Sequence, residues 1–166
     1  MIGIGCPEAE AAFLGALLLA PPRAAEALVG VMEDDFTDPR HQVVFAAMVE
    51  LVDQGVPADP VTLLGHLRRT GRLRPFTADR EPGAFLIDLA AACPLPASVQ
   101  HYRAVVLEHA LLRRAHEAGE RVQQAAEGGD PDVLLGVLDG EHRAVLAAAA
   151  RLRAPLRAVD RDKDAA

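Results

Sequence analysis

The C-terminal stretch from Ser98 to Leu152 decides the fold: SVQHYRAVVLEHALLRRAHEAGERVQQAAEGGDPDVLLGVLDGEHRAVLAAAARL. It is rich in strong helix formers, and the run Gly128-Gly129-Asp130-Pro131 interrupts it. Glycine closes a helix by adopting a left-handed conformation, and proline fits the first turn of the next helix. The stretch therefore predicts helices over residues 99–127 and 132–151, joined as an αα-hairpin.

Apolar and small side chains recur along both predicted helices at a spacing that places them on one face. On the first helix the row contains Val105, Leu112, Gly119 and Ala126, with Ala115, Ala118, Val122 and Ala125 beside it. On the second helix it contains Leu138, Val145, Ala149 and Leu152. A hairpin alone cannot bury apolar faces on both sides. We therefore expect it to pack on the N-terminal helices, on another copy of the chain or on a partner.

Three glycines lie inside these helices, at Gly119, Gly136 and Gly140. Each costs about 1 kcal/mol relative to alanine in a helix interior. One hypothesis is that close contact between helices compensates for this cost. The alternative is that the hairpin is marginally stable and frays.

Asp-Pro pairs divide the chain into helices, because the aspartate can cap the first free amides and proline lacks the donor that would be wasted there. They occur at Asp38-Pro39, Asp59-Pro60 and Asp130-Pro131. With the apolar spacing, they predict N-terminal helices over residues 7–19, 22–32, 39–54, 60–70 and 84–92. Val61, Leu64 and Leu67 are expected to face inward, and Ser98 is expected to cap the long helix.

The composition supports an all-α fold. The chain has 166 residues and 17.6 kDa, with 32 alanines, one tyrosine and no tryptophan, which argues against a β-sandwich or barrel. We expect a globular helical bundle over residues 1–97, followed by a long C-terminal helical hairpin over 98–153 and a flexible tail over 154–166.

Charge and hydropathy exclude several classes of protein. The net charge of −7 argues against direct nucleic-acid binding. The longest apolar run, residues 11–20, spans about 15 Å as a helix, too short for a bilayer. Cys6 and Cys93 have no ligand-like spacing and are interpreted as buried thiols in a reducing compartment. We expect a cytoplasmic protein without a membrane span.

Catalytic motifs are absent from the sequence. The single lysine, Lys163, is followed by Asp164, so a Walker A motif is impossible. Ser98 is the only serine, and the triplet Glu33-Asp34-Asp35 is interpreted as a solvated turn. The basic pair Arg113 and Arg114 could contact an acidic partner, but three acidic residues of the same helix offer local pairing, namely Glu108, Glu117 and Glu120.

The six histidines suggest one alternative function. His109 and His116 lie seven residues apart, with Glu120 one turn further on, and could form a metal-binding face of a small helical enzyme. More simply, the histidines lie at the surface or at interfaces, and we expect no metal site.

Four blocks of sequence carry a resemblance to a known family. They are PEAEAAFLGALLL from Pro7, DFTDPRHQVVFAAM from Asp35, GVPADPVTL from Gly55, and FLIDLAAACPLPASVQHYRAVVLEHALLRR from Phe85. In this order they resemble the N-terminal domain of DnaB-type replicative DNA helicases. The residues that match the family motifs are Asp38, Pro39, Arg40, His41, Asp59, Pro60, Tyr102, Arg113 and Arg114.

The resemblance implies an all-helical domain that performs no catalysis and needs no cofactor. In that family the hairpins of neighbouring subunits pair, the dimers form a ring, and the domain helps to bind primase. It therefore implies that this chain self-associates as a dimer or larger oligomer and contacts a replicative helicase or primase. The implied interface residues are Val105, Leu112, Ala115, His116, Gly119, Val122, Leu134, Leu138, Val145, Leu146 and Ala149.

The sequence departs from the family in two respects. The family's usual short Gly-Gly turn is replaced by the charged loop Arg72–Gly83, whose arginines offer a weaker hypothesis of single-stranded DNA binding. We expect no ATPase domain of the kind that follows in the family, and Met1 with the polar tail favours a stand-alone chain over an excised domain.

Overall fold

The computed structural model describes residues 5–20, 24–76 and 81–154, which form seven α-helices, two short 3-10 helices and no strand. The elements are α1 (Pro7–Leu19), α2 (Ala24–Leu28), η2 (Glu33–Asp35), α3 (Pro39–Asp53), α4 (Pro60–Thr70), α5 (Pro82–Ala91), η3 (Pro96–Ser98), α6 (Val99–Glu127) and α7 (Pro131–Arg153). The predicted all-α fold is confirmed.

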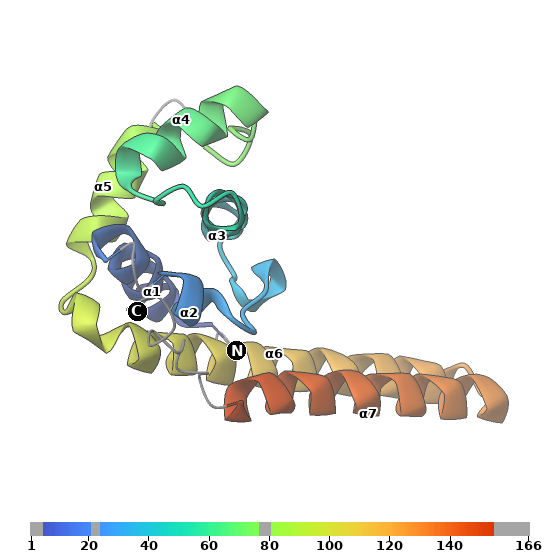
Figure 1. The fold of residues 1–166 in the computed structure, drawn as a ribbon. Helices are drawn as coiled ribbons and strands as arrows, with labels where there is room; N and C mark the ends of the chain where they lie inside the picture. The colour runs from blue at the N-terminus through green and yellow to red at the C-terminus, as the bar shows by residue number, and fades with distance from the viewer. Residues whose placement is uncertain (1–4, 21–23, 77–80, 155–166) are drawn as a thin grey trace.

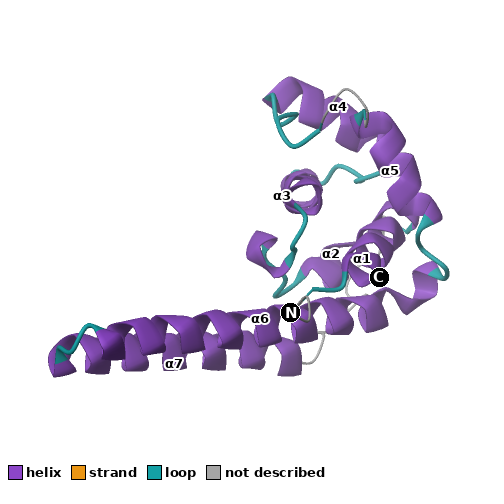
Figure 2. Cartoon of the chain, turned by 180° about the vertical axis from the view of Figure 1, so that it is seen from behind, coloured by secondary structure: helices purple, strands orange, loops and turns teal. Residues whose placement is uncertain are grey.

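Two parts of the structure differ in shape. The helices α1 to α5 form one group in which α1 and α2 lie on α6 and α3, α4 and α5 lie beyond them, and we call α1 to η3 the head (Figure 1). The second half of α6 runs out from the head, and α7 returns antiparallel beside it, so that the hairpin projects as an arm (Figure 2). The predicted hairpin is confirmed in position and topology.

All three predicted aspartate caps are confirmed. Asp38 accepts a hydrogen bond from the main-chain amide of Arg40, Asp59 accepts from two amides at the start of α4, and Asp130 accepts from two at the start of α7. The predicted cap at Ser98 is wrong, because its side chain makes no capping bond. The short η3 helix leads directly into α6 there, which leaves the serine without the extended conformation of a cap.

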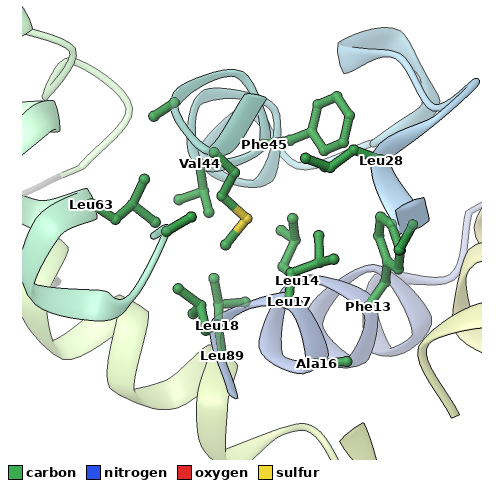
Figure 3. Packing of buried hydrophobic residues seen from close by; sticks show 14 of the residues in the cluster. Phe13, Leu14, Ala16, Leu17, Leu18, Leu28, Val44, Phe45, Leu63 and Leu89 are labelled. Carbon is green, nitrogen blue, oxygen red and sulfur yellow. The ribbon is translucent and has the colours of Figure 1, made fainter. Parts of the chain in front are cut away.

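The core of the head is built around α1, which is apolar on nearly every side and is buried accordingly. Figure 3 shows Leu14 and Leu17 of α1 directed toward Val44 of α3, with Leu63 of α4 beside them. The first half of α6 closes the core with Val106 and other buried side chains.

Several sequence-based details need correction. The predicted helix over 22–32 is much shorter, since α2 ends at Leu28 and Gly30 follows with a φ of 77°; Pro22 lies outside the described residues. Because α2 ends at Leu28, the residues that follow it can turn toward α6, where Arg103 donates to the carbonyl of Val29. Val61 is 80% exposed, and Leu63 takes the inward position instead. Cys93 is buried as expected, whereas Cys6 is partly exposed.

No single helix in the described ranges is long and apolar enough to cross a membrane. One bent pair, α5 together with residues 96–127, passes on length and composition, with an angle of 88° between its two parts.

At Gly15 the backbones of α1 and α5 come close together. A Cβ atom at this position would lie 2.0 Å from the main-chain oxygen of Leu89 and 3.0 Å from the Cβ of Cys93. Because backbone cannot move aside cheaply, we expect Gly15→Ala to lower the free energy of unfolding by about 3 kcal/mol or more.

Gly65 in α4 provides the matched control, because a Cβ there would meet nothing within 4 Å. Gly65→Ala should stabilise the protein by about 0.5–1 kcal/mol through helix propensity. Urea unfolding followed by circular dichroism measures both variants. A Gly15→Ala protein as stable as the parent would contradict the described packing of α1 on α5.

Candidate protein interaction surface

The predicted interface residues lie along the hairpin, and most retain exposed surface in the single chain. Three of the four leucines among them, Leu112, Leu138 and Leu146, are 58%, 41% and 54% exposed. Ala115, His116 and Gly119 are exposed as well, while the remainder are half-buried: Val105, Val122, Leu134, Val145 and Ala149. An arm that exposes this many apolar side chains has the character of a contact surface.

The contact between α6 and α7 buries small side chains. They are Ala118 of α6 and, nearer the head, Ala148 of α7. Glu141 of α7 accepts from Arg114 Nη2 at 2.6 Å and from Arg121 Nη1 at 3.0 Å. These ion pairs tie the two helices at mid-length. Arg114 also lies 4.0 Å from Glu117, so its expected local pairing is the weaker of its two contacts.

The three hairpin glycines do not mediate the contact between α6 and α7. A Cβ built at Gly119, Gly136 or Gly140 would meet nothing within 4 Å. Among the described residues, close packing inside this hairpin therefore does not explain the three glycines.

Arginines fix the hairpin to the head. Arg151 near the end of α7 binds both carboxylate oxygens of Asp35, with Nη2 2.9 Å from Oδ1. Arg103 and Arg113 of α6 donate to the main-chain carbonyls of Val29 and Asp34, at 2.7 and 2.6 Å. The interpretation of Asp35 as part of a solvated turn is wrong, because Asp35 is only 3% exposed and its carboxylate is bound by Arg151. The local pairing expected for Arg113 is also replaced by this long-range contact.

The motif residues Asp38 to His41 form a structural joint between α1, α3 and α5. Buried His41 approaches Glu10 Oε2 with Nδ1 at 2.7 Å, and Glu10 also accepts from the amide and hydroxyl of Thr37. Arg40 pairs with Asp38, and its guanidinium lies 4.8 Å above the ring of Phe85. This cluster joins three helices through polar contacts that the apolar core cannot supply.

A second histidine joins α3 to α4. His66 Nε2 lies 2.7 Å from Glu50 Oε2, and Arg69 donates to His66 Nδ1 at 3.0 Å. Since His41 and His66 are both buried, the expectation that the histidines lie at the surface or at interfaces is wrong for these two. Proline at residues 39 and 60 begins α3 and α4, and Tyr102 packs on the edge of the core.

The alternative metal face gains no support in the part of the chain that the structure describes. His116 lies 3.5 Å from Glu120, but no group of three or more histidine, cysteine, aspartate or glutamate residues is placed to hold a metal ion there.

Comparison with known proteins gives these features their context. The model of the DnaB-like helicase N terminal domain matches residues 6–108. The chain belongs to this family. The match covers α1 to α5 and the first part of α6, which include the Asp38–His41 joint. The resemblance of the four sequence blocks is thereby confirmed.

The family relatives are replicative DNA helicases. The chain is 41% identical to DnaB of Mycobacterium leprae over 127 residues, which cover 74% of this chain and 20% of that protein. It is 35% identical to DnaB of Leifsonia xyli, over 76% of this chain and 27% of that one. This chain therefore spans only about a quarter of the helicases it matches.

A solved structure shows the same fold. The crystal structure of the N-terminal domain of DnaB helicase from Mycobacterium tuberculosis has a TM-score of 0.75 and 34% identity to this chain. The match covers 84% of this chain and 97% of that structure. This chain therefore corresponds to the N-terminal domain of a replicative helicase, which is part of the replication machinery.

The pH dependence of stability should report on the joint at Glu10. Burial raises the pKa of this carboxyl, but hydrogen bonds from His41 and Thr37 outweigh burial and leave the pKa below its ordinary value. A lowered pKa in the folded state stabilises the protein above the unfolded pKa, and this contribution is lost as the pH falls through the folded value. We expect Glu10→Gln to cost about 3 kcal/mol at neutral pH, because His41 loses its charged partner.

Urea unfolding at a series of pH values between 7 and 3 tests this, with Glu8→Gln as the exposed control. The difference between the parent and Glu10→Gln should shrink as the pH falls below 4.5, the ordinary value for glutamate. A difference that stays constant down to pH 3 would show that the carboxylate charge contributes nothing.

Proposed function

We propose that this chain is a non-catalytic interaction module of the DNA replication machinery, which self-associates through the hairpin and contacts a replicative helicase or primase in the cytoplasm. The observation that carries the proposal is the exposed apolar row on the arm, in a chain that belongs to the helicase N-terminal domain family. The contacts with helicase and primase rest on family membership.

The geometry of the arm favours pairing with a second hairpin. Leu112 of α6 and Leu146 of α7 expose more than half of their surfaces, and burying them in a contact removes apolar area from water. The helical glycines Gly119, Gly136 and Gly140 have open space where a Cβ would lie, so another helix could approach the backbone closely there. A face that combines exposed leucines with glycines, which leave the backbone accessible, is typical of surfaces where helices pair.

The metal-dependent enzyme is the weaker candidate. Its proposed ligands are His109, His116 and Glu120. Of these, His116 and Glu120 lie 3.5 Å apart, but among the described residues no group of three or more possible ligands is placed to hold a metal ion.

Self-association can be tested at Leu112. We expect Leu112→Glu to dissociate the oligomer, because a charge would be buried at the centre of the contact. Size-exclusion chromatography with light scattering measures the mass. Val61→Glu is the control, since Val61 is 80% exposed on α4 of the head and should leave the mass unchanged. If Leu112→Glu and Leu146→Glu both keep the parent mass, the hairpin is not the interface.

The partner can be tested by mixing the chain with the replicative helicase and the primase of its host. We expect co-migration with at least one of them in the same light-scattering experiment. Elution of all three as separate species would contradict a role at the replication fork while leaving self-association intact.

A further inference from the structure

A surface pocket of about 440 Å³ lies on the head between α1 and α5, next to the start of α3. Its floor is apolar, because Phe85 and Leu89 of α5 line it together with Ala11 of α1. Phe85 and Leu89 belong to the core and are 4% and 2% exposed, so they are fixed in place. Ala92 of α5 also lines the pocket and leaves it open at that side. The volume is enough for a small ligand or for a side chain or two of a bound protein.

Two accessible carboxylates stand beside this apolar floor. Glu8 of α1 and Asp88 of α5 are exposed residues that line the pocket from different helices. Within residues 5–20, 24–76 and 81–154, neither carboxylate forms an ion pair, and the hydrogen bond described for Glu8 comes from the uncharged thiol of Cys6, at 3.8 Å. Both carboxylates therefore keep acceptor positions that a ligand can reach.

The pocket has a net negative charge after its internal pairs are counted. Among the described residues that line it, Arg40 is the only permanent cation, and Asp38 pairs with it and offsets its charge. His41 lines the pocket as well, but Glu10 binds it and offsets its charge whenever the imidazole is protonated. The charges of the two exposed carboxylates therefore remain uncompensated in either protonation state of the histidine.

We propose that this pocket binds a basic segment of a partner protein, with a lysine or arginine side chain that reaches between Glu8 and Asp88 while its aliphatic stem packs on the apolar floor. Such side chains combine a long apolar stem with a charged end. The net negative charge favours a cation, and the apolar floor favours a side chain over a hydrated ion. The inference rests on the proposed role as an interaction module, but not on pairing of the hairpins, because the pocket lies on the head.

The test uses a fluorescein-labelled synthetic peptide of lysine, leucine and alanine, and the same peptide with glutamine in place of lysine. Fluorescence anisotropy should show the lysine peptide bound and the glutamine peptide bound at least about tenfold more weakly, as expected for loss of a charge-assisted hydrogen bond. Spermidine is titrated separately as the free-cation probe, and we expect it to displace the peptide only at a concentration far above that of the peptide itself.

Because the whole chain carries a net charge of −7, the variants must separate this pocket from general attraction. Glu8→Gln combined with Asp88→Asn removes both accessible carboxylates and should weaken the lysine peptide about tenfold or more. Asp53→Asn combined with Glu108→Gln is the matched control, because it changes the net charge equally at exposed positions that do not line the pocket. Screening by salt should keep the effect of the control below about twofold.

A second pair of variants tests the space rather than the charge. Ala92→Trp fills the pocket at an exposed position and should also weaken the lysine peptide about tenfold or more. Ala91→Trp places the same side chain at the neighbouring exposed position, which does not line the pocket, and should leave the affinity unchanged. Circular dichroism melting verifies that each variant is folded.

Four results would overturn the inference: no binding of the lysine peptide, equal weakening by the two double variants, unchanged binding by Ala92→Trp, or displacement of the peptide by spermidine at an equal concentration. The second would indicate attraction to the overall charge, and the fourth a site for free polyamines. Light scattering keeps the two proposals apart. Glu8→Gln with Asp88→Asn should lose the peptide and keep the oligomer mass, whereas Leu112→Glu should lose the mass and keep the peptide.

Discussion

The position of the hairpin depends on one buried carboxylate, that of Asp35. Among the described elements, α7 packs chiefly on α6, and near its end Leu152 packs against the core of the head. Next to it, Arg151 adds the polar contact: it binds both carboxylate oxygens of Asp35 and donates to the carbonyl of Gly30 as well. A bidentate arginine–carboxylate contact fixes orientation as well as distance. The arm thus leaves the head in a defined direction.

The segment that carries Asp35 is itself held by α6. Arg103 and Arg113 donate to the carbonyls of Val29 and Asp34, which both precede Asp35, and Gly30 has the positive φ that lets the chain turn there. The buried side chain of Arg103 is desolvated, which lowers its pKa from the ordinary arginine value without removing its charge. Main-chain carbonyls thus hold the guanidinium groups of Arg103 and Arg113 in place, as the carboxylate of Asp35 holds that of Arg151.

The head and the hairpin differ in what their residues contribute. The apolar core and the joint between Glu10 and His41 stabilise the head, and neither involves the outer half of the hairpin. The outer half instead exposes Leu112, Leu138 and Leu146 to solvent, which costs little in a structure already fixed at its base. An arm with an uncovered apolar row is well suited to contacts with other chains.

The sequence by itself determined the local features. Asp38, Asp59 and Asp130 cap their helices because an aspartate before proline needs only its own neighbours to do so. The hairpin could be predicted because Gly128-Gly129-Asp130-Pro131 interrupts a long run of helix formers. The order of the four sequence blocks indicated the family. Each of these signals lies within a few consecutive residues.

Only the tertiary structure decided which charged residues are buried. Asp35 and Arg151 are 116 residues apart, and Glu10 and His41 are 31 apart, so no periodicity relates the partners. Taken alone, the acidic triplet at residues 33–35 looks solvated, because an unpaired carboxylate belongs in water. Folding brings Arg151 over it and reverses that preference.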